Sequence, residues 1–256
     1  MPFQKQLERH FLSFTIRNLL STQLLSDGTE LIRYIRIGHR TGDIHCPSGF
    51  GGFIEPAFIL HGINIIIRMH SAVEEVPMSK KVLILSGSPR KGGNSDILCD
   101  EFLRGAQDAG HKAEKIRVAE KKVAPCSGCY YCSTHGGACV HKDDMADILQ
   151  KMIDADVIVL ASPVYFYSIS AQLKTVIDRT VARWLEVKGK EFYYITTMAD
   201  EEKASADTTL ACFRGYADCV EGAVEKGVLV AGGVYEPGAV RNTSAMAQAY
   251  EMGRNV

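Results

Sequence analysis

The sequence predicts an α/β protein whose main domain is a doubly wound, five-stranded parallel sheet in three layers, α/β/α. Two observations support this prediction. Short, continuous apolar runs recur from residue 78 onward and end in loops rich in Gly or Ser, as expected of strands buried on both faces. Segments with apolar residues at helical spacing separate these runs, and such strand-helix alternation is typical of a parallel sheet.

The first strand is expected at KVLILS (81–86), because the run is apolar and stops at a Gly/Ser loop. The following helix has apolar residues three and four apart, can be capped by Asn94 or Ser95, and stops at Gly110. A second strand is expected within HKAEKIRVA (111–119). These elements form the first strand-helix-strand unit.

The remaining elements repeat the alternation. The apolar runs DVIVLAS, EFYYITTM and KGVLVAG predict the other three strands, over residues 156–162, 191–198 and 226–232. Helical spacing predicts helices from Asp143 or Asp144 to about 154, and near 170–185, 205–222 and 243–253. Cys212 and Cys219 are seven residues apart and are expected on one buried face of the third of these helices.

The chain changes in composition near residue 78. Residues 1–77 contain one lysine against six arginines, and Met78 directly precedes the first strand. We therefore expect residues 1–77 to be an N-terminal extension outside the functional domain, which spans 78–256. A genuine small N-terminal subdomain is the alternative.

Bulk properties exclude several classes of protein. The formal net charge of -1 argues against a general nucleic-acid binder, which needs a basic surface for phosphate backbones. The longest apolar stretch, FILHGINIIIRMH, is interrupted by His61, Arg68 and His70, so no membrane span is expected. Eight cysteines without a clear signal peptide favour the cytoplasm, where thiols stay reduced.

The loop SGSPRKGGNS (86–95), between the first strand and the first helix, predicts a phosphate site. Its glycines allow close backbone approach, Ser88 and Ser95 offer hydroxyls, and a helix N-terminus follows. Gly93 and Asn94 stand where a nucleotide-triphosphate loop needs Lys and Ser/Thr, and there is no G-x-G-x-x-G. A monophosphate ester fits this loop best, and an ordinary Gly/Ser turn is the alternative.

A second loop, SPVYFYSIS (162–170), follows the third strand. Tyr165, Phe166 and Tyr167 are poor residues for a solvated loop, but they suit a flat conjugated ring lying against them. Simple core packing of these aromatics is the alternative. Together the two loops indicate a ligand that carries both a phosphate and an aromatic ring.

Four cysteines form a third motif, C-x2-C-x2-C-x6-C, made of Cys126, Cys129, Cys132 and Cys139. Disulfides are disfavoured in a reducing compartment, and zinc usually takes two C-x2-C knuckles separated by a longer spacer. The first three cysteines resemble the start of a ferredoxin cluster motif, although the last gap is longer than in ferredoxins. Cysteines that act only as small buried hydrophobes are the alternative.

From about Met78 to Val256 the chain resembles the flavodoxin-like, NAD(P)H-dependent FMN reductase group. The resemblance is carried by G-S-P-R-x-G-x-N-S, by S-P-V-Y-x-x-S-x-x-A-x-L-K-x-x-I-D-R and by the closing A-G-G-V-Y-E-P-G. It implies a flavodoxin-like strand order 2-1-3-4-5, bound FMN, and NAD(P)H as co-substrate. Plain flavodoxins have a Thr-rich phosphate loop, so the resemblance favours a reductase over an electron shuttle.

The resemblance also implies roles for individual residues. Ser88, Arg90, Gly93, Asn94 and Ser95 would hold the FMN phosphate, and Pro163, Val164, Tyr165, Phe166 and Ser168 would line the flavin ring. The iron-sulfur flavoprotein branch of this group implies a [4Fe-4S] cluster on Cys126, Cys129, Cys132 and Cys139. No side chain is expected to be catalytic, because the chemistry takes place on FMN.

The leading functional hypothesis is an FMN-dependent oxidoreductase that passes electrons from NAD(P)H to a small acceptor such as a quinone or a nitro compound. One alternative is an iron-sulfur flavoprotein that transfers electrons between partner proteins, including a ferredoxin-type partner. Another is a non-catalytic flavin-binding module. The resemblance further implies a homodimer or a higher homo-oligomer.

Overall fold

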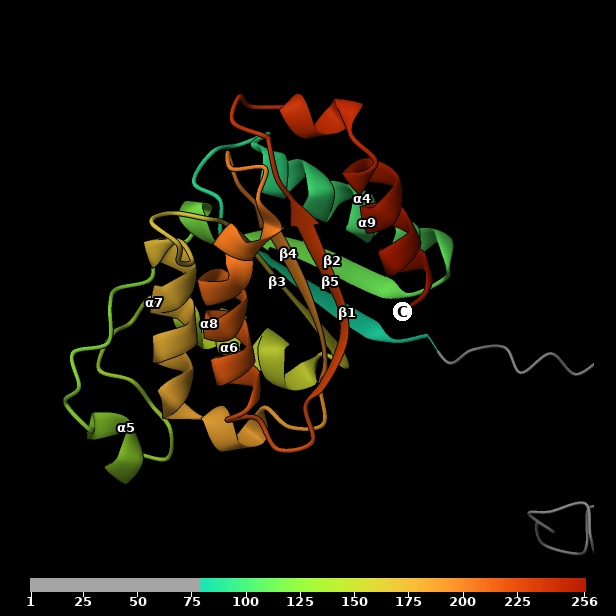
Figure 1. The fold of residues 1–256 in the computed structure, drawn as a ribbon. Coiled ribbons are helices and arrows are strands. Elements are labelled where there is room, and N and C mark those ends of the chain that lie inside the picture. Colours follow the sequence, from blue (N-terminus) through green and yellow to red (C-terminus); the bar gives the residue numbers. More distant parts are fainter. Residues whose placement is uncertain (1–78) are drawn as a thin grey trace, which may run out of the picture. The chain divides into compact units, whose positions relative to one another are not determined.

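The computed structural model describes residues 79–256, which form a parallel sheet covered by helices on both faces (Figure 1). The five strands lie in the order β2-β1-β3-β4-β5, and every neighbouring pair is parallel. The strands are β1 Lys81–Ser86, β2 Lys112–Arg117, β3 Val157–Pro163, β4 Glu191–Thr197 and β5 Val224–Ala231. The predicted fold class and strand order are confirmed. The prediction made for residues 1–77 lies outside the described residues.

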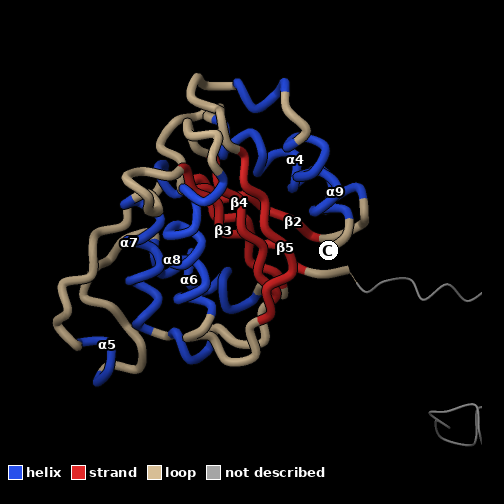
Figure 2. Tube along the Cα trace, viewed as in Figure 1, coloured by secondary structure: helices blue, strands red, loops and turns tan. Residues whose placement is uncertain are grey.

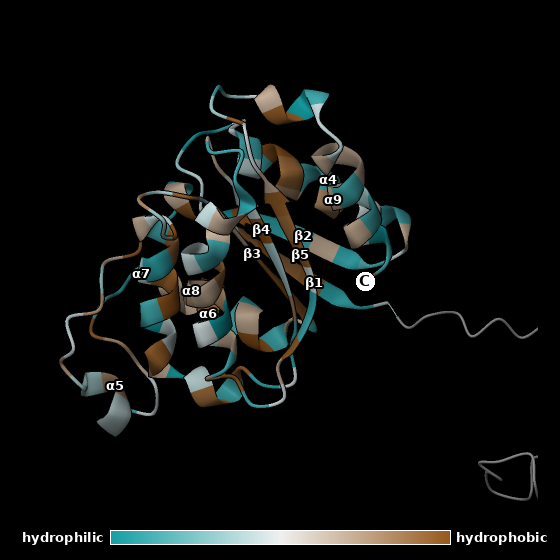
Figure 3. Cartoon of the chain, viewed as in Figure 1, coloured by the Kyte–Doolittle hydropathy of each residue, from teal (hydrophilic) through white to brown (hydrophobic). Residues whose placement is uncertain are grey.

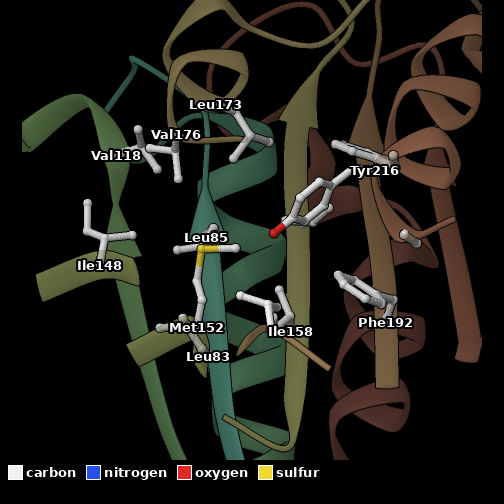
Figure 4. Close-up of a cluster of buried hydrophobic side chains, with 14 of the residues drawn as sticks. Leu83, Leu85, Val118, Ile148, Met152, Ile158, Leu173, Val176, Phe192 and Tyr216 are labelled. Carbon is white, nitrogen blue, oxygen red and sulfur yellow. The ribbon is translucent and has the colours of Figure 1, made fainter. Parts of the chain in front are cut away.

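Two helical layers enclose the sheet. Side chains of the first layer pack with Leu83, Leu85 and Ile158 on one face, and the helices of this layer are α6 Met145–Asp154, α7 Ala171–Arg179 and α8 Asp207–Ala217. Figure 4 shows part of this core, in which Met152 lies against the strand residues. The opposite face is covered by α4 Asn94–Asp108 and α9 Ala245–Arg254.

Burial of the sheet on both faces explains the apolar runs that predicted the strands. Along β1, Leu83 and Leu85 face one helical layer, while Val82 and Ile84 face the other. Because side chains alternate across a strand, burial on both faces demands an apolar residue at every position. Figure 3 shows brown, hydrophobic segments along β3 and β5.

Three helix predictions need correction. The helix expected near 170–185 ends at Arg179 and is followed by short 3-10 turns over Thr180–Ala182 and Trp184–Glu186. The β-branched pair at 180 and 181 disfavours a continuing helix, and the Thr180 hydroxyl donates to Ile177 O at 2.7 Å. Helix α8 ends at Ala217, so Cys219 lies beyond it and is exposed rather than part of the core.

The third correction concerns the start of α4. Gly93 occupies the N-cap position, and no side chain caps the helix. Asn94 and Ser95, which were expected to cap it, are the first two helical residues instead. Because α4 begins inside the loop 86–95, the first N–H groups of the helix have no side-chain cap there.

Candidate functional site

The two loops predicted to bind one ligand lie together at the carboxyl ends of the strands. Ser170 Oγ, at the end of the second loop, donates to Gly87 O in the first loop at 2.7 Å. Gly87 N in turn donates to Ala161 O of β3 at 2.8 Å. A Cβ at position 87 would lie 2.8 Å from Leu173 Cβ, so only glycine allows this approach. In open α/β sheets, ligands bind at this edge.

The first loop leads into the uncapped N-terminus of α4. Ile97 N–H donates to Gly93 O at 2.9 Å, which is the first regular helical bond. The N–H groups that precede it receive no side-chain cap and carry the positive end of the helix dipole. Backbone donors of this kind bind phosphate groups.

Asn94 and Ser95 use their side chains to position the loop. Asn94 Nδ2 donates to Val234 O at 3.1 Å and to Glu236 O at 3.0 Å, while its Oδ1 accepts from Val240 N at 3.3 Å. Ser95 Oγ and Thr197 Oγ1, at the end of β4, are 2.7 Å apart. These bonds explain why neither side chain caps α4, and they link the loop to the ends of β4 and β5.

Asp96 stabilises the same loop through hydrogen bonds of its side chain. Its buried carboxylate accepts from Gly92 N at 3.0 Å and from Ser86 Oγ at 3.1 Å, and it pairs with Lys115 and Arg117. Burial raises the pKa of Asp96, but the Gly92 N–H and the two cations outweigh burial and lower it. The negative charge is therefore compensated by cations and does not oppose an anion at the loop. Arg90 and Ser88 lie on the same turn, Arg90 exposed and Ser88 buried.

The second loop holds two aromatic residues in a strained backbone. Phe166 and Tyr167 have φ of 50° and 60°, between Tyr165 and Ser168, which exchange two backbone hydrogen bonds of 2.8 and 3.0 Å. This is a tight turn with both central residues left-handed, a conformation that usually takes glycine or asparagine. Phe166 is fully exposed and Tyr167 is 61% exposed. Such strain is typical of functional sites.

The arrangement fits a ligand with a phosphate and a flat ring. Close backbone approach at Gly87, free helical N–H groups and Arg90 suit the phosphate, and the exposed aromatic turn suits the ring. Pro163 and Val164 are half-buried beside that turn, and Val164 N donates to Thr197 O at 2.8 Å. The half-buried Ser168 has its Oγ 3.7 Å from Cys212 Sγ.

The four clustered cysteines lie elsewhere, on the long connection between β2 and α6. Figure 2 shows this connection as loop interrupted by a short helix, α5 Tyr131–Thr134. All four cysteines line one pocket of about 170 Å³, with Cys126 and Cys129 exposed and Cys132 and Cys139 half-buried. Within residues 79–256, no three His, Cys, Asp or Glu side chains converge closely enough to hold a single metal ion.

Local hydrogen bonds favour a thiolate in this segment. The Tyr131 N–H and the Ser127 hydroxyl bond to Cys129 and lower the pKa of its thiol. Tyr130, between Cys129 and Cys132, has a φ of 58° and is 81% exposed. Thiolates are the ligands of iron-sulfur clusters, so the segment fits that group.

An ion pair between Arg179 and Asp143 connects the two ends of the cysteine segment. Arg179, at the end of α7, donates to both carboxylate oxygens of Asp143 at 2.7 and 3.0 Å and to Ala124 O at 2.6 Å. The Arg179 guanidinium lowers the pKa of Asp143 to about 2. Asp143 also accepts from Ala124 N at 2.9 Å, so residues on both sides of the cysteines are joined.

Sequence reasoning missed four residues that build these sites: Ser170, Thr197, Asp143 and Arg179. The sequence predicts Asp143 only as a possible first residue of a helix, whereas in the structure its side chain pairs with Arg179. Arg179 ends the I-D-R motif, which was the only available signal. Neither residue's partner could be identified, because Asp143 and Arg179 are 36 positions apart.

Comparisons with known proteins identify the family of this chain and several similar proteins. Residues 80–211, just over half of the chain, match the model of a family described as NADPH-dependent FMN reductase. An iron-sulfur flavoprotein of Methanocaldococcus jannaschii is 46% identical over 100 residues, which are 39% of this chain and 51% of the relative. An iron-sulfur flavoprotein of Archaeoglobus fulgidus is 39% identical over 99 residues, covering 39% and 44%. The match thus spans about half the length of these relatives.

Solved structures share the fold at low sequence identity. An NAD(P)H:quinone oxidoreductase from Methanothermobacter marburgensis has a TM-score of 0.56 at 19% identity, covering 69% of this chain and 96% of the other. An azoreductase from Bacillus anthracis has a TM-score of 0.57 at 15% identity, covering 69% and 100%. These similarities establish the flavodoxin-like fold.

Proposed function

Because this chain belongs to the NADPH-dependent FMN reductase family, we propose that it is an FMN-dependent oxidoreductase that passes electrons from NAD(P)H to a small acceptor. The observation that carries this proposal is the Ser170–Gly87 bond, which joins the phosphate loop to the aromatic turn at one edge of the sheet. A single ligand of FMN's chemistry can engage both loops.

Different residues bind the phosphate and the ring of FMN. Arg90, the hydroxyls of Ser88 and Ser95, and the N–H groups of Asn94 and Ser95 hold the phosphate. Gly93, whose own N–H donates to Arg90 O at 3.1 Å, forms the N-cap beside it. Asn94 acts through its backbone because its side chain is already bonded. Pro163, Val164, Tyr165, Phe166 and Ser168 orient the ring. Bound FMN would supply hydride acceptance from a nicotinamide and electron delivery to a quinone or nitro compound.

Anaerobic stopped-flow mixing tests this proposal. FMN-loaded protein is mixed with NADH and, separately, with NADPH, and the flavin absorbance is followed before and after a quinone is added. We expect bleaching with at least one nicotinamide and recovery on adding the quinone. A flavin that binds tightly but stays oxidised with both nicotinamides would instead support the non-catalytic binding module.

A second function is favoured by the shared pocket of the cysteines. We propose that Cys126, Cys129, Cys132 and Cys139 hold a [4Fe-4S] cluster, so that the protein can exchange single electrons with a partner such as a ferredoxin-type protein. Anaerobically purified or reconstituted protein should contain about four irons and four sulfides per chain, with broad absorbance beneath the flavin bands. If the protein contains no iron after reconstitution, the cluster proposal is refuted and only the reductase proposal remains.

Assembly, partners and location are also proposals. The exposed aromatic turn favours a homodimer or a higher homo-oligomer, in which a second copy would cover Phe166 and Tyr167. We propose that residues 78–256 are the functional domain and that the protein is located in the cytoplasm. Among residues 79–256, no helix has the length and apolar character needed to cross a membrane.

A further inference from the structure

Arg179 is the cation that faces the cysteine pocket from the folded core. Its side chain is 2% exposed, and it lines the same pocket as the four cysteines. An arginine keeps its positive charge even when buried, so burying it requires compensating anions and acceptors. Part of that compensation comes from Asp143, whose side chain is 12% exposed.

The guanidinium has donors left after its bonds to Asp143 and Ala124. The structure gives Arg179 three hydrogen bonds to these two residues, while a guanidinium carries five N–H donors. Burial opposes the charged form of Arg179, but the hydrogen bonds to Asp143 and the nearby Cys139 raise its pKa. Arg179 and Cys139 line the same pocket, so the remaining donors belong to a side chain that borders the cysteine site.

A second donor group lies in the same pocket. The buried Nε2 of His141 has no hydrogen-bond partner among the described residues, and His141 lines the pocket beside Cys139. Sulfur atoms with negative charge accept N–H bonds of this kind, and hydrogen bonds to the sulfurs help set the potential of iron-sulfur clusters. Arg179 and His141 thus place side chains that can donate N–H bonds in the lining of the cysteine pocket.

We propose that Arg179 is a positioning residue that provides the internal positive charge of the cysteine site, so that it stabilises the anionic cluster and favours its reduced state. This inference rests on the cluster proposed above. A [4Fe-4S] core held by four thiolates is an anion, and one-electron reduction adds one negative charge. A buried cation beside the cluster stabilises the more negative state more strongly, which raises the midpoint potential.

A purely structural role for Arg179 makes different predictions. In that case Arg179 and Asp143 only close the loop, and any pair that keeps a hydrogen bond between positions 179 and 143 would serve. The charge of Asp143 also matters, because removing Arg179 alone leaves a carboxylate near the thiolates. The test must therefore separate the charge from the hydrogen bonds.

The experiment uses the full chain with FMN and a reconstituted cluster. We compare wild type with Arg179→Lys, Arg179→Gln and the double variant Arg179→Gln/Asp143→Asn, and use Arg214→Gln as the matched control. Arg214 is an exposed arginine of α8 whose partner is Glu225, at 2.8 Å, and it does not line the cysteine pocket. The readouts are the cluster midpoint potential, followed by electron paramagnetic resonance during a redox titration, and the rate of iron loss to a chelator.

We expect Arg179→Gln to lose iron about tenfold faster or more and to have a lower midpoint potential, while Arg179→Lys stays close to wild type in potential. The double variant should also have a lowered potential, and Arg214→Gln should leave both readouts unchanged. If Arg179→Gln holds no cluster while Arg179→Lys does, the charge requirement is likewise supported.

Two results would overturn the inference. One is a double variant with wild-type potential and iron retention, or equal losses in Arg179→Lys and Arg179→Gln, because either shows that the charge is not needed. The other is wild-type protein that takes up no iron while its flavin is still reduced by NAD(P)H. That second result refutes the cluster and the role of Arg179 together, but leaves the reductase proposal standing.

Discussion

The phosphate loop (residues 86–95) and the cysteine segment (residues 125–142) differ in how the fold holds them. Most of the phosphate loop is buried, and its side chains bond to the ends of β4 and to the loop after β5. None of residues 125–142 is buried, and the hydrogen bonds that hold the segment to the rest of the domain are at its ends, through Ala124 and Asp143. The phosphate loop is held in place by the fold itself, whereas we expect the conformation of the cysteine segment to depend on what its cysteines bind.

This contrast is consistent with the chemistry proposed for each region. A phosphate is recognised by N–H groups that must already point at one place, so a rigid helix start suits it. A cluster forms strong bonds to its thiolates and can order a loop as it binds, so pre-formed packing is less necessary. Loss of a ligand should therefore disturb the cysteine segment more than the phosphate loop.

The largest expected effect concerns the cysteine segment alone. Cys129→Ser should reduce bound iron to a small fraction of the wild-type amount, because a serine hydroxyl does not replace a thiolate ligand. FMN content and the folded state should not change. Iron and flavin analysis checks this, with the exposed Cys219→Ser as control. Iron retained in Cys129→Ser would place the cluster on other ligands.

The second effect concerns the phosphate loop alone. Arg90→Ala/Ser95→Ala should weaken FMN binding by about two powers of ten or more, since each charge-assisted bond contributes about 1.5 to 3 kcal/mol. Fluorescence-quenching titration measures the FMN affinity. The control is Arg104→Ala, which changes an exposed arginine on α4, the helix that contains Ser95. Iron content should be the same in both variants. An unchanged FMN affinity would locate the phosphate elsewhere.

The third effect is a pH dependence at the anchor of the cysteine segment. The pKa of Asp143 is about 2 in the folded protein against an ordinary value of 3.8, so its contribution is complete above about pH 4 and is lost as the pH falls toward 2. The contribution is about 2 kcal/mol. Urea unfolding between pH 5 and 2 should show a steeper loss of stability in wild type than in Asp143→Asn. Parallel curves for the two proteins would exclude this ion pair as the cause.

The smallest effect concerns the aromatic turn. Phe166→Gly should raise the free energy of unfolding by about 1 kcal/mol relative to Phe166→Ala, because glycine adopts the φ of 50° without strain. FMN affinity should fall in both variants, because both lack the ring. Denaturant unfolding of the flavin-free proteins measures the first difference. Equal stabilities would mean that the backbone at position 166 is not strained.

Much of the fold could be predicted from the sequence. Apolar runs such as KVLILS, the helical spacing between them and the loop at 86–95 are local patterns, and local periodicity is enough to identify buried strands and their order of occurrence. The flavodoxin-like strand order came from the family resemblance and is confirmed. Helix ends were less predictable: the end of α7 at Arg179 depends on residues that do not break a helix outright.

By itself, the sequence determined the class of fold, the two loops for a phosphate and a ring, and the four cysteines with their spacing. The tertiary structure alone decided which side chains work together: Ser170 with Gly87 across 83 positions, Asn94 with the loop after β5 across 140 or more, and Arg179 with Asp143. The physical reason is that periodic patterns report burial, whereas a hydrogen bond between distant residues depends on how packed elements bring two atoms within about 3 Å of each other.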